Sequence, residues 1–207
     1  MYKLYYMPGA CSMAIHVLLN ELGQSVTLVN VGDPHSDAKK ELLKINPRSQ
    51  VPTLVDDGHV IREGAAVILH LLQKHSNSLL PDSGKERATA LEWLMFANAT
   101  LHPAYARGFF ALKNFEGETQ KKVLDFTIQH INKHWEEVEQ RLEKSPYIAG
   151  QQLTAADILL TVIANWSSYF QGIKIGQKTK DLFRKVIALP SYQKALKTEE
   201  VEYKAAA

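Results

Sequence analysis

The sequence predicts an α/β region with the element order βαβαββα over residues 1–78, followed by an all-helical bundle over residues 85–207. Three observations lead to this division. Short apolar, strand-like runs alternate with helical patterns in the first region, whereas only helical periodicity follows it. A single apolar stripe marks a long helix over residues 124–142. The segment Leu-Leu-Pro-Asp-Ser-Gly at residues 79–84 has the composition of a linker.

The elements of the first region are marked by their boundaries. A helix is expected to begin at Ser12 and to stop before Gly23, because apolar residues recur at helical spacing between them and glycine favours a helix C-terminus. Asp-Asp-Gly at residues 56–58 separates two short apolar runs and predicts a hairpin turn. The expected strands are 4–6, 26–31, 51–55 and 60–61, and the expected helices are 12–22, 38–44 and 65–74. The first two strands should be parallel and joined by a right-handed crossover.

The second region carries its own helix signals. The stripe of the long helix consists of six apolar residues spaced 4, 3, 4, 3 and 4 apart: Leu124, Ile128, Ile131, Trp135, Val138 and Leu142. Thr154 and Asp157 have the spacing of a capping box, so a buried helix should begin there. Further helices are expected from about Glu86, over residues 178–186 and from Ser191.

Composition excludes several classes of function. The chain has 24 Lys and Arg against 22 Asp and Glu, and the formal charge of +2 is too small to drive nucleic-acid binding by counterion release. The single cysteine, Cys11, excludes an internal disulfide, a Cys-x-x-Cys pair and a cysteine-rich zinc site. No targeting leader or long apolar run is found, so a cytoplasmic protein without membrane contact is expected. His130 and His134 have no third ligand in the sequence pattern, and no metal site is expected.

Two helix starts carry candidate chemistry. Cys11 begins the first helix, where free N–H groups and the helix dipole lower the pKa of a thiol; a buried structural cysteine is the alternative. Ser12 is either a donor to a thiolate or a helix N-cap. Glu63 and Gly64 precede the third helix, whose first N–H groups suit a carboxylate. Glu63 could instead be a charge that only favours the helix start.

Four motifs in fixed order carry a resemblance to a known family. They are Tyr5–Ser12, Asn46–Leu54, Arg62–Ile68 and Leu153–Asp157. Together they resemble the glutathione S-transferases, and the start of the chain is similar to the bacterial beta class. The resemblance implies a thioredoxin-like glutathione-binding domain first and an all-helical domain second. It also implies an acceptor-substrate pocket in the cleft between the two domains.

The resemblance implies where glutathione binds. Gln50 and Val51 precede Pro52, whose peptide bond is cis in this family, so that the N–H and C=O of Val51 pair with the extended peptide. Glu63 would bind the γ-glutamyl ammonium group, and the N–H of Gly64 would bind the γ-glutamyl carboxylate. The family usually has serine where this chain has Gly64, so one hydrogen bond to glutathione is missing here.

The resemblance also indicates which groups activate the thiol. The candidate catalytic residues are Cys11, Ser12, Tyr6 and His102. Asn98 lies on the same predicted helix face as His102 and is expected to contact glutathione, whereas Pro103 stands where the beta class often has a basic residue. The aromatic residues expected to line the acceptor pocket are Tyr105, Phe109 and Trp166, with Phe110 and Tyr169 as further candidates.

The predicted function is therefore a glutathione transferase that conjugates glutathione to small, largely apolar electrophiles, as in detoxification. A homodimer is expected, with glutathione as co-substrate and no cofactor. Two alternatives remain open. Cys11 could carry thiol–disulfide exchange or peroxide reduction, which Cys11→Ala would abolish. A non-catalytic ligand-binding module is the other alternative, and the unusual Gly64 and Pro103 keep it open.

Overall fold

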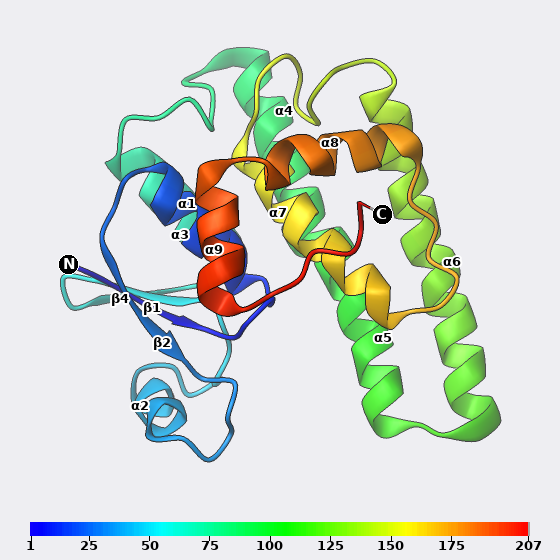
Figure 1. The fold of residues 1–207 in the computed structure, drawn as a ribbon, viewed down its shortest axis with the longest axis horizontal. Helices are drawn as coiled ribbons and strands as arrows, with labels where there is room; N and C mark the ends of the chain where they lie inside the picture. The colour runs from blue at the N-terminus through cyan, green and yellow to red at the C-terminus, as the bar shows by residue number, and fades with distance from the viewer. Residues whose placement is uncertain (207) are drawn as a thin grey trace. The chain divides into compact units, whose positions relative to one another are not determined.

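The computed structural model describes residues 1–206, and these residues form two compact units (Figure 1). The first unit combines Met1–Leu80 with Ile187–Glu202, and the second combines Pro81–Val186 with the residues from Tyr203 onward. A mixed sheet with helices is followed by a helical bundle, which confirms the predicted fold class. The units differ from the expected ranges in two respects: the boundary lies between Leu80 and Pro81, within the expected linker, and residues 187–202 belong to the first unit and not to the second.

The first unit is built on a four-stranded sheet. Its strands are β1 (Tyr2–Tyr6), β2 (Val26–Asn30), β3 (Thr53–Asp56) and β4 (His59–Arg62), in the spatial order β2-β1-β3-β4. β1 and β2 are parallel, as predicted from the helix that connects them, and the other two pairings are antiparallel.

The turn and the start of β3 follow from local chemistry. Asp57 and Gly58 both have positive φ, 46° and 88°, which is the conformation that an Asp-Gly hairpin favours. The predicted hairpin is therefore confirmed. β3 begins at Thr53 and not at Val51 as predicted, because Pro52 has no N–H to donate to a neighbouring strand.

Helices cover both faces of this sheet. Figure 1 shows α2 (Asp37–Ile45) on the opposite side of the strands from α1 (Ser12–Glu21) and α3 (Gly64–Lys74). α2 packs through Leu42, which is fully buried against Tyr5 of β1. Successive strand residues point to opposite faces, so β1 is buried on both sides.

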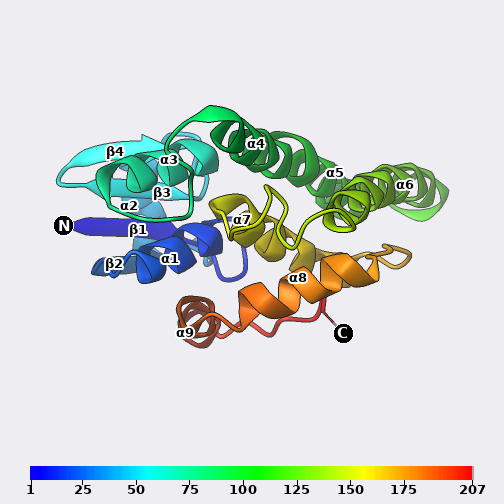
Figure 2. The same ribbon diagram turned by 90° about the horizontal axis from the view of Figure 1, so that it is seen from above.

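The last helix, α9 (Pro190–Glu199), belongs to the first unit because it packs against α1. Figures 1 and 2 show the two helices side by side. The Asn20 side-chain amide donates to the carbonyl of Ser191 at 3.2 Å, and His16 of α1 is hydrogen-bonded to Glu199. The sequence predicted a helix from Ser191, but it could not identify the surface that the helix covers.

The second unit is a bundle around a buried helix. Its elements are α4 (Gly84–Met95), η1 (Phe96–Leu101), α5 (His102–Asn114), α6 (Gly117–Leu142), α7 (Ala155–Ala164), η2 (Asn165–Tyr169) and α8 (Gln177–Ile187). Every residue of α7 is buried. In the predicted stripe of α6, Ile131, Trp135, Val138 and Leu142 are buried, whereas Leu124 and Ile128 are partly buried. The capping box at Thr154 and Asp157 is confirmed.

One predicted helix of this unit is interrupted. The helix expected from about Glu86 contains η1, a π-helical turn over residues 96–101, directly before Pro103. Proline has no N–H and its ring clashes with the carbonyl four residues earlier, so the regular α-helical hydrogen bonding cannot continue through this position. In a π-helical turn the hydrogen bonds join residues five positions apart instead of four, and such turns are frequent at functional sites.

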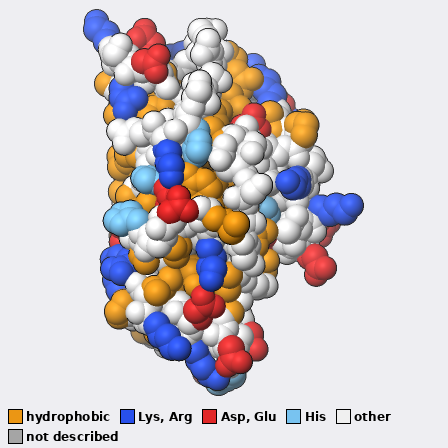
Figure 3. Space-filling view, turned by 90° about the vertical axis from the view of Figure 1, so that its left-hand side faces the viewer, with side chains coloured by type: hydrophobic (Ala, Val, Ile, Leu, Met, Phe, Trp, Pro, Cys, Tyr) orange, Lys and Arg blue, Asp and Glu red, His pale blue; other side chains and the backbone are white. Residues whose placement is uncertain are grey.

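The surface agrees with the small net charge. On the face shown in Figure 3, acidic and basic side chains are interspersed among hydrophobic ones. Within residues 1–206, no helix combines the length and the apolar character needed to cross a bilayer.

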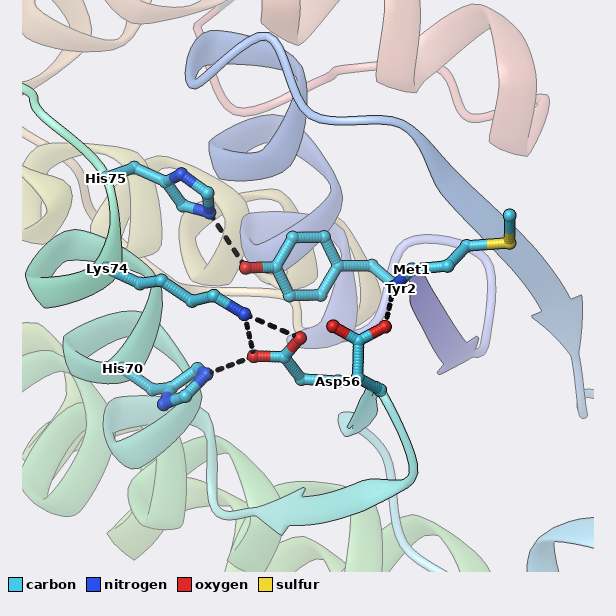
Figure 4. Close-up of polar contacts among 7 residues, drawn as sticks. Met1, Tyr2, Asp56, His70, Lys74 and His75 are labelled. Carbon is cyan, nitrogen blue, oxygen red and sulfur yellow. Dashed lines mark hydrogen bonds and ion pairs between the residues drawn. The ribbon is translucent and has the colours of Figure 1, made fainter.

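A polar cluster joins the ends of the two central strands, β1 and β3, to α3 (Figure 4). The carboxylate of Asp56 is only 7% exposed and accepts hydrogen bonds from Lys74 at 2.6 and 2.8 Å and from the His70 ring at 2.7 Å. The Tyr2 hydroxyl and the His75 ring lie beside this group, 2.8 Å apart. Burial acts to raise the pKa of Asp56, but the combined hydrogen bonds and charges of Lys74 and His70 outweigh burial and leave the pKa below its ordinary value.

We expect Asp56→Asn to lower the free energy of unfolding at pH 7 by about 1–2 kcal/mol, since its partners stay partly hydrated. A lowered folded pKa means that the ionised carboxylate stabilises the fold above the ordinary pKa of about 4, and that this stabilisation is lost as the pH falls through the folded pKa. Urea unfolding between neutral and acidic pH should therefore show the two proteins converging on acidification. Asp57→Asn, at an exposed neighbour, is the matched control and should stay close to wild type. A gap that widens on acidification would contradict this account.

Candidate functional site

The loop between β1 and α1 is folded around Ser12. The Ser12 hydroxyl donates to the Met7 carbonyl at 3.3 Å and accepts from the Met7 N–H at 3.2 Å, and Ser12 is fully buried. Gly9 has φ of 67°, a conformation that glycine adopts without steric cost. Cys11, and not Ser12, occupies the N-cap position of α1, so the N-cap interpretation of Ser12 was wrong. The Ser12 hydroxyl is committed to the loop and not to a thiol.

Cys11 lies at the predicted helix start but is not a thiolate. Its Sγ lies 3.4 Å from the Val51 carbonyl, to which the thiol donates. Although part of the residue is exposed, burial raises the pKa of Cys11 to about 11. Hydrogen bonds from the N–H groups of Ser12 and of Cys11 itself act in the opposite direction, as the helix start predicted, but they are outweighed. The expectation of a lowered pKa was wrong, because sequence spacing does not show how deeply the sulfur is placed.

The expected cis bond between Val51 and Pro52 is confirmed. The Val51 carbonyl faces the Cys11 sulfur. The N–H of Val51 has no hydrogen-bond partner within residues 1–206, and Gln50 beside it is exposed. Val51 thus offers an unpaired main-chain donor, while its main-chain acceptor borders the Cys11 thiol.

The segment before Val51 is organised by Asn46. This side chain is 1% exposed, and its amide donates to the Gln50 carbonyl at 3.1 Å and to the Thr53 hydroxyl at 2.9 Å. Its oxygen accepts from the Arg48 N–H at 3.3 Å. Asn46 therefore holds both ends of the turn that presents Val51.

Glu63 stands at the start of α3 in an unusual backbone conformation. Its φ and ψ are 71° and 120°, a region that costs a non-glycine residue about 1–3 kcal/mol. Strain of this kind collects at functional sites. The side chain is 61% exposed and forms an ion pair with Arg48 at 2.7 Å. No side chain caps α3, so the N–H groups from Gly64 onward are not bound by a cap.

Two further candidates lie together in the second unit. His102 begins α5, and its ring packs on Trp166 with the centroids 5.0 Å apart. Burial lowers the pKa of His102, so the imidazole is neutral at pH 7. Asn98 lies one turn earlier, in η1, and is partly exposed.

The aromatic residues expected around a pocket differ in how deeply they are buried. Tyr105 is fully buried, with its hydroxyl 2.6 Å from Ser167 and 2.7 Å from the indole N–H of Trp135. It is a core residue, and its expected place in a pocket lining was wrong. Phe109 is half-buried against Trp166, whereas Phe110 and Tyr169 are exposed.

Comparison with known proteins gives the same order of domains. The family model described as the glutathione S-transferase N-terminal domain matches residues 4–79, and the one for the C-terminal domain matches residues 101–200. The chain belongs to the glutathione S-transferase family. It is 33% identical over 175 residues to the glutathione S-transferase GstA of Escherichia coli O157:H7, which covers 80% of this chain and 82% of that protein.

Solved structures support a bacterial type of glutathione S-transferase. A glutathione S-transferase from Xylella fastidiosa matches with a TM-score of 0.89 at 28% identity, over 98% of this chain and 100% of that one. The bacterial beta-class enzyme of Sphingomonas chungbukensis matches with a TM-score of 0.82 at 25% identity, over 97% and 100%. Glutathione transfer is thus the activity of this family member.

The structure adds residues that sequence reasoning passed over in this glutathione S-transferase. Asn46 and Arg48 lie inside a motif that was recognised, but their contacts with Thr53 and Glu63 could not be read from it. Lys39, whose ammonium group donates to the Ser49 carbonyl at 3.0 Å, gave no signal in the sequence. No group of three or more His, Cys, Asp or Glu residues suited to a metal ion occurs in the described part of the chain.

Proposed function

We propose that this glutathione S-transferase binds glutathione as an extended strand along Val51, ionises its thiol at the start of α1 and conjugates the glutathione sulfur to small, largely apolar electrophiles. The observation that carries the proposal is the unpaired N–H of Val51, a residue whose carbonyl lies 3.4 Å from the Cys11 sulfur, close to the N–H groups of Cys11 and Ser12. An extended peptide that pairs with Val51 places its central cysteine next to these groups.

The other end of the tripeptide fits the groups at α3. Its γ-glutamyl ammonium would pair with the Glu63 carboxylate, and its carboxylate would accept from the uncapped N–H groups of Gly64 and Ala65. Arg48 is close enough to Glu63 to share in this contact. A solved sphingomonad glutathione S-transferase, 26% identical over 97% of this chain, is described as complexed with glutathione, in line with this proposal.

The chemistry requires the glutathione thiol to lose a proton to solvent before its sulfur attacks. A free thiol with a pKa of about 8.5 is only a few per cent ionised at pH 7. The N–H groups of Cys11 and Ser12 would stabilise the thiolate, and the Cys11 thiol would add a donor once its S–H turns from the Val51 carbonyl to the glutathione sulfur. The thiolate then forms a bond to the electrophilic carbon, and the leaving group departs with its electron pair. His102 and Asn98 are proposed further donors, Tyr6 stays a candidate, and Phe109 with Trp166 would form part of the acceptor lining.

Assembly and context are proposed by analogy with the family: a homodimer in the cytoplasm, acting on foreign electrophiles. Redox exchange through Cys11 is disfavoured, because the relatives are named transferases and a thiol with a pKa of about 11 is a poor nucleophile at pH 7. A non-catalytic module is disfavoured by the same relatives.

Retention on immobilised glutathione together with turnover of a generic aryl halide tests the proposal. We expect the wild-type protein to be retained, to be eluted by free glutathione and to catalyse the conjugation. Retention without turnover would contradict the transferase activity. Failure to be retained would contradict the placement of glutathione itself.

Cys11 gives a separate prediction. Without glutathione, alkylation of Cys11 by iodoacetamide should rise about tenfold per pH unit between about pH 7 and 10, because only the thiolate reacts. Cys11→Ala should keep the conjugation rate within about tenfold of wild type, since a neutral hydrogen bond contributes about 0.5–1.5 kcal/mol. Mass spectrometry is unambiguous here because Cys11 is the single cysteine. A plateau near pH 7, or complete loss of conjugation, would make Cys11 a thiolate nucleophile instead.

A further inference from the structure

Glu199, at the end of α9, is a buried carboxylate with two different partners. Its side chain is fully buried, and Oε1 lies 2.9 Å from Nδ1 of His16 in α1, which is itself 2% exposed. Its second oxygen, Oε2, accepts the backbone N–H of Gly9 at 3.0 Å. One carboxylate from the end of the chain therefore holds α1 and the loop that precedes it.

The loop that Glu199 reaches is the one that carries Cys11. Gly9 stands two residues before Cys11, and Ser12 anchors the other side of the loop through Met7. Val201, which follows Glu199, lies against the same glycine, with its methyl carbons 3.5 and 3.6 Å from the position that a Cβ at Gly9 would take. The loop is thus held by Ser12 through Met7 and by the end of α9 through Gly9.

The hydrogen bond from the Gly9 N–H is not needed to pair Glu199 with His16. His16 alone would satisfy one carboxylate oxygen and join α9 to α1. The bond to Gly9 extends this support to the point where the chain leaves β1 and turns toward the N–H groups of Cys11 and Ser12. A charge-assisted bond to a backbone N–H is short and directional, so it fixes where those N–H groups lie.

We propose that Glu199 is a positioning residue for thiol activation: through Gly9 it aligns the N–H groups of Cys11 and Ser12 with the sulfur of bound glutathione. The inference rests on the proposed function, in which these N–H groups stabilise the thiolate. Glu199 lies 188 positions from Cys11 in the sequence and touches neither glutathione nor the acceptor in this scheme.

Two tyrosines lie close enough to Glu199 for its charge to affect them. Burial raises the pKa of Tyr6, and the charge of Glu199 raises it further. Tyr192, which is fully buried on α9, is affected in the same two ways. Both tyrosines therefore stay neutral at physiological pH, and the ring of His16 is hydrogen-bonded to the Glu199 carboxylate.

Glu199→Ala tests the proposal, with Glu200→Ala as the matched control, since Glu200 is the next residue and is exposed. The measurement is the ultraviolet absorbance of the glutathione thiolate in the complex against pH, with the Kd for glutathione from calorimetry. Glu199→Ala is expected to lower the thiolate fraction at pH 7 by about tenfold, as misplaced donors raise the thiol pKa, with Kd within a factor of about three. Glu199→Gln, which keeps an oxygen for Gly9, should recover most of the thiolate, and Glu200→Ala should match wild type.

A second variant covers the case in which Glu199→Ala does not fold. Glu199→Asp keeps the charge but draws the carboxylate back by one carbon–carbon bond, so that it cannot reach His16 and Gly9 together, and it should show the same loss of thiolate. A folded Glu199→Ala or Glu199→Asp protein with the wild-type thiolate titration would overturn this inference and leave the proposed function intact. A wild-type protein that binds no glutathione would overturn both.

Discussion

Asp157→Ala is expected to lower the free energy of unfolding by about 3–5 kcal/mol, a large part of the total stability of a domain. The Asp157 carboxylate is fully buried and accepts from the Ile148 N–H, the Thr154 N–H and the Thr154 hydroxyl, each at 2.8 Å. Alanine would leave two buried backbone donors unpaired, at about 1–3 kcal/mol each. A simple helix cap contributes only about 0.5–2 kcal/mol, so the bond to Ile148 makes the difference.

We expect the loss of stability in Asp157→Ala to come mainly from the missing acceptor oxygens and less from the missing charge. Burial raises the pKa of Asp157 to about 6, although the hydrogen bonds from Ile148 and Thr154 act to lower it. The ionised form is therefore not strongly favoured. Asp157→Asn keeps one acceptor oxygen and should lose clearly less than Asp157→Ala in urea unfolding at pH 7. Asp125→Ala, at a half-exposed carboxylate of α6, is the control and should stay within about 0.5 kcal/mol of wild type. Equal losses in Asp125→Ala and Asp157→Ala would refute the argument.

Glu63→Gln is expected to weaken glutathione binding by about 10- to 30-fold, equivalent to about 1.5–2 kcal/mol. The substitution preserves the shape of the side chain but removes the charge that would pair with the γ-glutamyl ammonium. It also removes the ion pair with Arg48, which is exposed and contributes little to stability. The melting temperature should therefore change little while the Kd from calorimetry rises.

A glutathione analogue without the α-amino group separates this contact from a general disturbance of the site. The analogue should bind wild type and Glu63→Gln with similar affinity, because the partner of the charge is already missing. If the analogue were weakened by the substitution as strongly as glutathione, Glu63 would not be the ammonium partner.

The sequence predicted the elements that depend on local chemistry. Asp57-Gly58 specifies the hairpin, Thr154 and Asp157 specify the start of α7, and the spacing of apolar residues specifies α6. These signals lie within a few residues of the structure that they determine. The interruption at η1 was missed, although Pro103 was an available signal for it.

The features that the sequence could not predict arise from tertiary placement. The position of Cys11 at a helix start predicts a lowered thiol pKa and left a buried structural cysteine as the alternative, but the depth of its sulfur determines the pKa. Tyr105 has the spacing of a pocket residue, but it bonds to Ser167 and Trp135 in the core. The contact of Glu199 with Gly9 joins residues 190 positions apart, and no local pattern records it.

A crystal structure of the chain with bound glutathione tests the central claim most directly. We predict that the cysteinyl backbone of glutathione accepts from the Val51 N–H, with its sulfur within about 3.5 Å of the Cys11 or Ser12 nitrogen. A tripeptide bound elsewhere, or a Val51 N–H left unpaired in the complex, would contradict the account.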